Sequence, residues 1–482
     1  MRLSQICKDV VPELQEVPPL EVTGVSADSR TVVPGDLFIA IPGNKADGGR
    51  YVADAAARGA VAAIAATGAE LPSELGIPLL RTPDPRVALA KISACVYAGQ
   101  PATVVAVTGT SGKTSVAEFT RQIFAACGRK SASLGTIGVV TSSSTAYGSL
   151  TTPDPVTLHK TLAALASEGI THLAMEASSH GLDQHRLDGV NITAAAFTNL
   201  GRDHLDYHPT IEAYFAAKMR LFEDLLPPHL PAIINRDGAF STEAEAIARR
   251  SGRQVLTVGR NGDTITLLAA ERAGFAQRLT LRIGTTIAAV DLPLVGAYQA
   301  ENALVAAALA MAVGESTEDV IAAMASLKGV KGRLEIVREH QGALAVVDYA
   351  HKPEALAAAL DACRPFATGR LICVFGCGGD RDRGKRPIMG RIAAEKADVV
   401  IVTDDNPRSE QPAAIRAEVL AGAPGALEIG ERQLAIQGAV RMMGPGDVLL
   451  VAGKGHETGQ IVGDTVFPFS DHEVLSEAMG GP

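Results

Sequence analysis

One short glycine-rich segment has the residue types and spacing of a phosphate-binding loop. Gly109-Thr110-Ser111-Gly112-Lys113-Thr114-Ser115 follows the apolar run TVVAV and precedes a stretch with apolar residues at helical spacing. In a strand–loop–helix unit of this kind, backbone N–H groups surround a polyphosphate and the helix N-terminus adds positive potential. Lys113 would contact the outer phosphates, and the Thr114 hydroxyl would bind magnesium. A purely structural turn is the alternative. The loop is shorter than the standard nucleoside-triphosphatase loop, which points away from switch GTPases and transporters.

Three further residues could complete a metal or carbamate site beside this loop. Glu176 follows the apolar run THLAM, where it is either a Mg²⁺ ligand or a solvated acid at a strand end. His204 lies in the polar loop NLGRDHLDYH and is either a second metal ligand or an ordinary hydrogen-bonding histidine. Lys218 lies on a predicted helix with an apolar stripe. It is either a surface lysine whose stem packs on that stripe, or a lysine with a lowered pKa that can react with CO₂.

Four polar loops in the last third of the chain each follow an apolar strand. The strands ALAVV, LICVF, DVVIV and DVLLV are almost continuously apolar, as in a parallel sheet covered on both faces. They precede the segments DYAHKP, GCGGDRDRGKR, TDDNPRSE and AGKGHET. Ligands of such sheets bind beyond the carboxyl ends of the strands, so we expect one shared site. A chance clustering of surface loops is the alternative.

The elements that position these residues divide into three blocks, all α/β. Residues 1–99 alternate short strands with alanine-rich helices, and residues 100–332 contain the phosphate loop, a mainly parallel sheet and a side sheet at about 253–295. Residues 333–482 alternate strand and helix in the manner of a Rossmann-like domain. Strands are predicted at VAAIAA, LLRTP and ITAAAF, and helices over about 85–98 and at ENALVAAALAMAV.

Composition excludes several classes of protein. The 482 residues are 47% hydrophobic and 20% charged, which is ordinary for a folded chain, and the net charge of −9 does not favour nucleic-acid binding. No apolar run is long enough to span a bilayer, and the N-terminus has no signal-peptide core. The six cysteines lack zinc-site spacing and are expected to be reduced core residues.

Ten motifs in a fixed order resemble the Mur ligase family of cell-wall synthesis. They are GTSGKTS, MEASSHGLDQHR, TNLGRDHLDYH, AAKMRLF, ENALVA, GRLE, DYAHKP, GGDRDRGKRP, DNPR and GKGHE. The resemblance spans the chain and implies a UDP-sugar-binding domain (1–99), a central ATP-binding domain (100–332) and a C-terminal amino-acid-binding domain (333–482). It implies an ATP-dependent, amide-forming ligase of peptidoglycan synthesis, and hence of cell shape and division. Such a protein is expected to be cytoplasmic and monomeric, with neither membrane insertion nor nucleic-acid binding.

The resemblance also assigns roles to individual residues near the nucleotide. It implies ATP and Mg²⁺ as co-substrate and cofactor, with Lys113, Glu176, His204 and Lys218 as catalytic residues. Thr114, Glu176, His204 and the carbamate of a carboxylated Lys218 would bind metal. The ATP contacts would be the residues from Gly109 to Ser115 together with Asn302, Arg333, Asp348 and His351.

The two other substrates would have their own contacts. The UDP-sugar peptide, UDP-N-acetylmuramoyl-L-alanyl-D-glutamate, would contact Ala27, Ser29, Asn44, Lys45, Ala46, Thr151, Thr152, Ser178, Gln184 and Arg186. Plain turn chemistry before Pro153 is the alternative for Thr151 and Thr152. The amino acid would contact Arg381, Asp405, Asn406, Pro407, Arg408, Gly453 and Glu457, with Glu457 facing an ammonium group.

Asp405-Asn406-Pro407-Arg408 resembles the motif of family members that add meso-2,6-diaminopimelate, and lysine-adding members lack its arginine. Diaminopimelate has a second carboxylate that a guanidinium can bind through two hydrogen bonds. A surface charge at a helix start is the alternative for Arg408. Three rival functions stay open: a Mur ligase that adds lysine or another amino acid, a folylpolyglutamate synthase, and a nucleotide-regulated binding protein without ligase chemistry.

Overall fold

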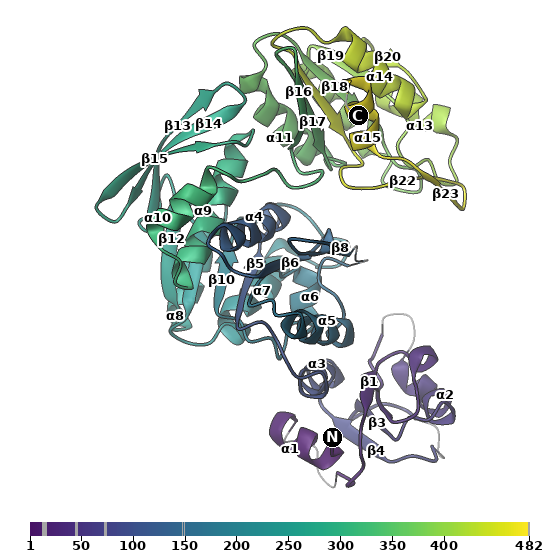
Figure 1. Cartoon of the computed structure of the whole chain (residues 1–482). Coiled ribbons are helices and arrows are strands. Elements are labelled where there is room, and N and C mark those ends of the chain that lie inside the picture. The colour runs from purple at the N-terminus through teal and green to yellow at the C-terminus, as the bar shows by residue number, and fades with distance from the viewer. Residues whose placement is uncertain (12–16, 44–46, 72–74, 147, 149, 481–482) are drawn as a thin grey trace. The chain divides into compact units, whose positions relative to one another are not determined.

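The computed structural model describes the chain except residues 12–16, 44–46, 72–74, 147, 149 and 481–482. The chain divides into two compact units, one of Met1–Thr257 with Ala308–Ser316 and the other of Val258–Ala307 with Thr317–Pro482. Each contains helices and mainly parallel sheets (Figure 1), so the α/β expectation is confirmed. Within the described residues, we find no helix with both the length and the hydropathy needed to cross a bilayer.

The first unit begins with a parallel four-stranded sheet in the order β1-β2-β3-β4. Its strands are β1 (Gly24–Ser26), β2 (Asp36–Ile39), β3 (Ala62–Ala66) and β4 (Leu79–Thr82). The helices are α1 (Leu3–Val10), η1 (Ser29–Thr31), η2 (Gly48–Tyr51), α2 (Val52–Ala57) and α3 (Pro85–Val96). The Asp84 carboxylate caps α3 by accepting hydrogen bonds from the backbone N–H groups of Arg86 and Val87. The predicted strands VAAIAA and LLRTP and the helix after them are therefore confirmed.

A second sheet in the same unit carries the phosphate loop. Its strands are β5 (Thr103–Thr108), β6 (Ser131–Gly135), β7 (Gly138–Val140), β8 (Thr145–Ala146), β9 (His172–Glu176), β10 (Ala194–Phe197) and β11 (Pro231–Asn235). They are hydrogen-bonded in the order β11-β10-β5-β9-β6-β7-β8, parallel from β11 to β6. The helices are α4 (Lys113–Ala126), α5 (Pro155–Ser167), α6 (Ser179–Asp183), α7 (Ile211–Arg220), the π-helical turn η3 (Leu221–Leu225) and α8 (Ser241–Arg250). The polar ends of β5, β9 and β10 consequently meet at one edge.

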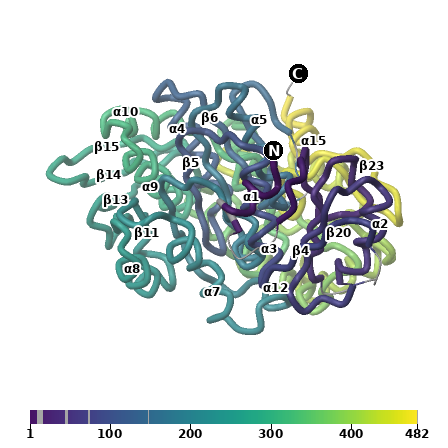
Figure 2. Tube along the Cα trace, turned by 90° about the horizontal axis from the view of Figure 1, so that it is seen from below, coloured from purple at the N-terminus to yellow at the C-terminus, as the bar shows by residue number. Residues whose placement is uncertain are grey.

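The second unit contains an antiparallel meander and a helix pair before its main sheet. The elements are β13 (Ile265–Ala273), β14 (Ala276–Ile283), β15 (Thr286–Leu292), α9 (Ala297–Ala312) and α10 (Thr317–Met324). The three strands lie side by side in both views (Figure 1; Figure 2). β12 (Gln254–Gly259) spans the division between the units, and so does α9, whose residues from Ala308 on belong to the first unit. The side sheet predicted at about 253–295 is confirmed by β12, β13, β14 and β15. The helix predicted at ENALVAAALAMAV is α9.

The main sheet of the second unit is covered on both faces. Its strands are β16 (Glu335–His340), β17 (Ala343–Asp348), β18 (Leu371–Phe375), β19 (Val399–Val402), β20 (Leu427–Glu428) and β21 (Val448–Ala452), in the order β16-β17-β21-β18-β19-β20. Leu344 and Val346 pack with α11 (Pro353–Cys363), α12 (Lys385–Lys396) and α13 (Pro412–Leu420). Ala345 and Val347 pack with α14 (Arg432–Met442) and α15 (Asp471–Ala478). This alternation confirms the two-face burial predicted from the apolar runs.

Three smaller elements complete this unit. They are η4 (Arg364–Phe366) and the hairpin of β22 (Gly459–Val462) and β23 (Thr465–Pro468). The edge strand β16 is antiparallel to β17 and was not predicted, because its residues are only partly buried and lack an apolar run. All six cysteines lie in the described residues and none forms a disulfide, as expected.

A fully buried ion pair lies beneath the carboxyl ends of this sheet. Arg432 donates hydrogen bonds of 2.7 Å from Nε and from Nη2 to the Asp471 carboxylate, and both side chains are 0% exposed. Arg432 also donates to the Ala452 carbonyl at 3.0 Å.

Asp471→Ala would leave a buried guanidinium without its counter-charge. We expect it to lower the free energy of unfolding of this unit by about 3–5 kcal/mol, measured by urea denaturation.

The matched control for this prediction is Asp361→Ala, which breaks the ion pair between Lys396 and an Asp361 that is 61% exposed. That substitution is expected to cost less than about 1 kcal/mol. Equal destabilisation by the two substitutions would contradict the prediction.

Candidate active site

The phosphate loop is held in shape by residues that follow β10. Gly109 has a φ of +147°, and a Cβ there would lie 1.9 Å from Thr198 Oγ1, so only glycine fits. The N–H groups of Thr110 and Ser111 donate to the Asn199 backbone carbonyl at 2.9 Å and to Asn199 Oδ1 at 3.1 Å. Thr198 and Asn199 were not singled out from the sequence, although their place after an apolar strand was a usable signal.

Lys113 is the first residue of α4, where Gly112 with a φ of +89° ends the loop. Its Nζ donates to the carbonyls of Gly109 and Thr110 at 2.9 and 3.0 Å. The ammonium group therefore folds back over the loop, and Thr114 and Ser115 lie in the first helical turn. This local geometry is the one expected of a loop that surrounds a polyphosphate.

Lys218 lies against the same loop and is almost completely buried, with 1% of the residue exposed. Its Nζ donates to the Gly109 carbonyl at 2.8 Å and lies 4.4 Å from the centre of the Tyr214 ring. Burial lowers the pKa of Lys218 well below its ordinary value, and the nearby Lys113 charge lowers it further. The alternative of a surface lysine is therefore wrong.

Glu176, the last residue of β9, is also buried, with 1% exposed. Its carboxylate accepts hydrogen bonds from the Thr136 N–H at 2.7 Å and from Thr136 Oγ1 at 3.3 Å. A Cβ on Gly135 would lie 2.1 Å from Glu176 Oε1, so the carboxylate packs directly on glycine backbone. The alternative of a solvated acid is wrong.

His204 is placed among aromatic rings. It has a positive φ of +53°, and its ring centre lies 4.8 Å from that of His180 and 6.1 Å from that of Tyr214. The His204 side chain is 42% exposed, so the ring is open to a ligand.

These side chains alone offer too few oxygen ligands for Mg²⁺. Water and the phosphate oxygens of a substrate would have to complete its coordination shell. In the part of the chain that the structure describes, no three His, Cys, Asp or Glu side chains gather as a metal cluster. Mg²⁺ typically takes one or two carboxylates and completes its shell with water and phosphate oxygens. The buried Glu176 carboxylate suits that arrangement. The Lys218 amine donates a hydrogen bond here and could hold a cation only after conversion to a carbamate.

Five residues expected to contact the sugar-peptide come together beside Glu176. Thr152 Oγ1 donates to the Glu176 carbonyl and accepts from the Ser178 N–H, at 2.9 and 3.0 Å. Arg186 donates to the Thr152 carbonyl and to Gln184 Oε1, both at 2.7 Å. Thr151 joins through a 3.1 Å contact with the Thr136 hydroxyl. Burial lowers the pKa of Arg186. The group therefore adjoins the candidate metal carboxylate.

Ala27 and Ser29, also expected to contact this substrate, follow β1 directly in the chain. Ala27 is exposed, and Ser29 is buried in η1 beside Asp28, whose carboxylate caps that turn. Asn44, Lys45 and Ala46 lie outside the described residues, so the contacts expected of that loop stay predictions.

The second group of expected nucleotide contacts lies in the second unit. Asn302 on α9 donates to Gln299 Oε1 at 3.0 Å, and Gln299 donates to the Arg333 carbonyl at 2.8 Å. The Arg333 guanidinium lies 4.9 Å from the Tyr349 ring centre, and its buried Nε has no hydrogen-bond partner among the described residues. An orphaned buried donor of this kind is suited to a ligand.

Asp348 is the last residue of β17, and His351 follows it in the same group. Asp348 Oδ2 accepts from the Leu334 N–H at 2.7 Å, and burial raises the pKa of Asp348 to about 6. Burial also lowers the pKa of His351, whose ring centre lies 4.6 Å from that of Tyr349. Arg333 and His351 thus lie against Tyr349, a residue not singled out from the sequence, and Asn302 is linked to Arg333 through Gln299.

The four loops beyond the carboxyl ends of the main sheet contact one another, as predicted. The Gly453 N–H donates to the Asp348 carbonyl at 3.1 Å, and Lys385 Nζ donates to the His351 carbonyl at 2.7 Å. Arg408 Nη1 donates to the Gly379 carbonyl at 2.9 Å, across the gap between two of the loops. The alternative, that these are surface loops clustered by chance, is therefore wrong.

Residues 405–408 form the centre of this cluster. Asn406 Nδ2 donates to Glu457 Oε2 at 2.9 Å, and the fully buried Lys454 donates to Asn406 Oδ1 and to Glu457 Oε2, at 3.0 and 3.2 Å. Asp405 is buried, and burial raises its pKa. The Asn406 amide is thus engaged in holding Glu457, a role that the sequence pattern did not distinguish from ligand contact.

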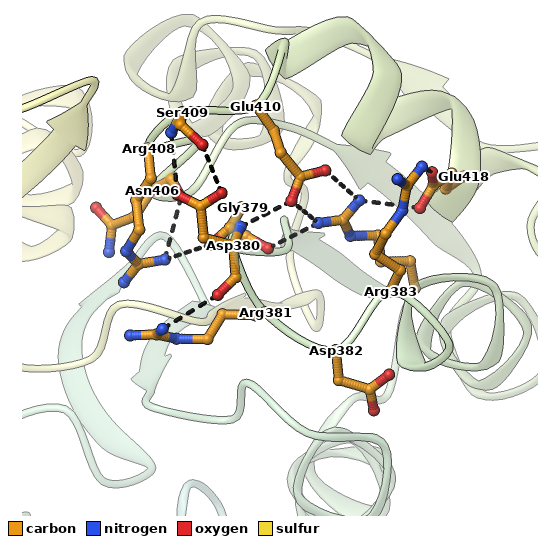
Figure 3. Close-up of polar contacts among 12 residues, drawn as sticks. Gly379, Asp380, Arg381, Asp382, Arg383, Asn406, Arg408, Ser409, Glu410 and Glu418 are labelled. Atoms are coloured by element: carbon orange, nitrogen blue, oxygen red, sulfur yellow. Dashed lines mark hydrogen bonds and ion pairs between the residues drawn. The ribbon is translucent and has the colours of Figure 1, made fainter. Parts of the chain in front are cut away.

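Two guanidinium groups lie at the edge of the cluster (Figure 3). Arg381 donates from Nη1 to the Asp380 carbonyl at 3.1 Å and is exposed, and Arg408 is half-buried. Arg408 precedes α13 by four residues and has a positive φ of +50°. It is therefore not a surface charge at a helix start, and that alternative is wrong.

A buried arginine supports the loops that carry Arg381 and Arg408. Arg386 is 0% exposed and binds the carboxylates of Glu410 and Glu418, at 2.8 and 2.9 Å. This contact lowers the pKa of Glu410 to about 2. Glu410 in turn accepts from the Asp380 N–H at 2.7 Å, and Ser409 Oγ donates to Asp380 Oδ1 at 2.6 Å (Figure 3). These contacts fix the two loops side by side.

Three family models match the chain in order. They are "Mur ligase family, catalytic domain" over residues 21–111, "Mur ligase middle domain" over 107–310 and "Mur ligase, glutamate ligase domain" over 332–455. These matches and the structural neighbours confirm the predicted three-domain α/β architecture.

Proteins of known name are similar over the full length. The UDP-N-acetylmuramoyl-L-alanyl-D-glutamate–2,6-diaminopimelate ligase of Rhizobium meliloti is 57% identical, with all of both chains covered. The protein of the same name from Brucella melitensis is 58% identical, with 96% of this chain and 95% of that one covered. A solved structure of a ligase with this name matches with a TM-score of 0.74 and 32% identity, covering 99% of this chain and 98% of that one. The chain belongs to the Mur ligase family.

Proposed function

We propose that the protein is an ATP-dependent ligase that joins meso-2,6-diaminopimelate to UDP-N-acetylmuramoyl-L-alanyl-D-glutamate in peptidoglycan synthesis. The observation that carries the proposal is the cluster around Asn406, where the Arg408 guanidinium and the Glu457 carboxylate lie on loops tied to each other. A cation and an anion so arranged suit an amino acid that presents an ammonium group and an additional carboxylate. The full-length relatives that carry this activity in their names support it.

The reaction begins with transfer of the γ-phosphoryl group of ATP to a free carboxylate of the peptide. A carboxylate is a poor acylating agent, and its acyl phosphate supplies phosphate as a leaving group. The amine of diaminopimelate attacks the acyl carbon, a proton is lost, and the tetrahedral intermediate expels phosphate to leave an amide. Lys113 and the loop N–H groups would hold the phosphates, and Arg186 with Thr152 would orient the peptide.

Lys218 would act after carboxylation. Its neutral amine attacks CO₂, forming an N–C bond and releasing one proton, which gives a carbamate. The lowered pKa of Lys218 favours this step because the amine is then neutral at a lower pH than an exposed lysine. The resulting carboxylate beside Gly109, together with Glu176, Thr114 and His204, would hold Mg²⁺. The ion would offset the charge of the transferring phosphoryl group.

Glu176→Gln is expected to raise the Mg²⁺ concentration needed for half-maximal activity at least tenfold, measured by magnesium titration at saturating ATP. The amide keeps an oxygen acceptor for Thr136, so the fold around it should persist. The control is Glu168→Gln at the end of α5, which should leave the titration unchanged. An unaltered Mg²⁺ requirement in Glu176→Gln would remove this residue from the metal site.

Three rival functions are separated by simple assays. A ligase turns over ATP only with both the nucleotide-sugar dipeptide and the amino acid present, whereas a nucleotide-regulated binding protein would hydrolyse ATP without them. A lysine-adding ligase would use lysine as well as diaminopimelate, and a folylpolyglutamate synthase would extend a folate with glutamate. ATP turnover that ignores both co-substrates would contradict the proposed function.

We also propose the setting in which the protein acts. The substrates named above are small molecules, and the net charge of −9 gives no support for nucleic-acid binding. A cytoplasmic monomer with domains at 1–99, 100–332 and 333–482 remains our proposal for location, assembly and domain boundaries. Size-exclusion chromatography with light scattering tests the monomer.

A further inference from the structure

The hairpin of β22 and β23 belongs to the second unit (Figure 1), and three of its apolar side chains are largely exposed. Val466 and Phe467 on β23 are 63% and 52% exposed, and Val462 on β22 is 42% exposed. A two-stranded hairpin is at best marginally stable by itself. Its contacts with the rest of the second unit must therefore supply much of its order.

Besides its pairing with β23, β22 is hydrogen-bonded to residues 405–408. Gln460 Nε2 donates to the Asp405 carbonyl at 2.6 Å, and the Ile461 N–H donates to Asn406 Oδ1 at 2.9 Å. The Arg408 N–H donates to the Ile461 carbonyl at 3.1 Å, and the Gly463 N–H donates to the Arg408 carbonyl at 2.8 Å.

These contacts fix a backbone conformation that Arg408 would not adopt unaided. A φ of +50° is sparsely populated for a residue with a long side chain, and it persists only where the surroundings over-determine it. Here the hairpin engages both the N–H and the carbonyl of Arg408. In this conformation the Arg408 guanidinium donates a hydrogen bond to the Gly379 carbonyl.

We propose that the hairpin holds the specificity segment 405–408 in register, and that Gln460 is the positioning residue that fastens it. The inference rests on the proposed function and extends it to a residue outside the binding site. Of the four hydrogen bonds between the hairpin and this segment, the one from Gln460 alone has a hairpin side chain as its donor. Gln460 contacts the Asp405 backbone and acts on the amino acid only through Arg408 and Asn406.

The test compares Gln460→Met, which keeps the length of the side chain but removes the donor, with wild type. Net loss of one hydrogen bond predicts that KM for diaminopimelate rises about tenfold. KM for ATP and for the nucleotide-sugar dipeptide, and kcat at saturation, should change less than twofold. The preference for diaminopimelate over lysine should fall by the same factor of about ten. Thr465→Ala, an exposed position on β23, is the control and should behave as wild type.

A double-variant cycle separates positioning from a general structural role. If Gln460 acts through Arg408, adding Gln460→Met to Arg408→Ala should lower kcat/KM for diaminopimelate less than twofold further. Gln460→Glu, which places a carboxylate against the Asp405 carbonyl, should reproduce or exceed the effect of Gln460→Met. Hydrogen exchange at the Arg408 and Gly463 amides should be faster in both Gln460 variants.

Two results would overturn the inference: an unchanged KM for diaminopimelate in both Gln460 variants, or an equal rise in KM for ATP. Either could occur while wild type still makes the diaminopimelate product, so the proposed function would survive. If wild type instead prefers another amino acid, the proposed function fails. The inference is then judged on the same variants with that amino acid.

Discussion

Replacing Lys218 with alanine is expected to lower kcat by about 100-fold or more, and added bicarbonate should not restore it. The ammonium or amine of Lys218 is buried against the Gly109 carbonyl at 2.8 Å, in the loop that would hold the phosphates. A carboxylated side chain at this position would place negative charge at the proposed Mg²⁺ site, and alanine can form no carbamate. The measurement is steady-state ligation at saturating substrates, with and without bicarbonate.

Lys91→Ala serves as the matched control because Lys91 is an exposed lysine on α3, away from the phosphate loop. It should leave kcat within twofold of wild type.

The pH dependence gives a second check on Lys218. Because its pKa is lowered, the amine is neutral at a lower pH than that of an exposed lysine, so activation of the wild-type protein by bicarbonate should extend to a lower pH than an exposed lysine would allow. Full activity of Lys218→Ala would remove the carbamate from the account.

Replacing Arg408 with lysine is expected to lower kcat/KM for diaminopimelate by about 100-fold, with little change in KM for ATP. The charge is kept, but an ammonium group cannot offer the two parallel donors that a guanidinium presents to a carboxylate. Loss of one hydrogen bond to a charged group, worth about 1.5–3 kcal/mol, has effects of this order. Turnover with lysine, which lacks the second carboxylate, should change less than threefold. The ratio of the two kcat/KM values is the quantity to measure.

Arg391→Lys is the control for Arg408→Lys, because Arg391 is an exposed arginine on α12 and the substitution keeps the charge in the same way. It should leave the ratio unchanged. An equal loss of activity with diaminopimelate and with lysine would show that Arg408 supports the fold and does not select the substrate.

The sequence predicted those parts of the molecule in which local pattern determines structure. Continuous apolar runs identified β5, β17, β18 and β21, because strands buried on both faces need no polar alternation. The phosphate loop was recognisable because its glycines and lysine follow such a strand directly. The four polar loops could be assigned to one site because parallel strands end at the same edge.

What the sequence could not predict depends on pairing between distant residues. Lys218 and an exposed lysine on an amphipathic helix have the same local pattern, and only the contact with Gly109, 109 residues away, distinguishes them. The Arg432–Asp471 pair spans 39 residues, and the bond from Gln460 to Asp405 spans 55. The positive φ of Arg408 has no local signal, because it is imposed by the hairpin that follows 51–60 residues later.

The central claim is that this chain makes an amide between diaminopimelate and the nucleotide-sugar dipeptide at the expense of ATP. The most direct measurement incubates the protein with ATP, Mg²⁺, UDP-N-acetylmuramoyl-L-alanyl-D-glutamate and either meso-diaminopimelate or L-lysine, and identifies the product by mass spectrometry. We predict a nucleotide-sugar tripeptide that contains diaminopimelate, formed with one ADP and one phosphate, and at least 100-fold slower product formation with lysine. Equal use of the two amino acids, or ADP release without any amide product, would contradict the account.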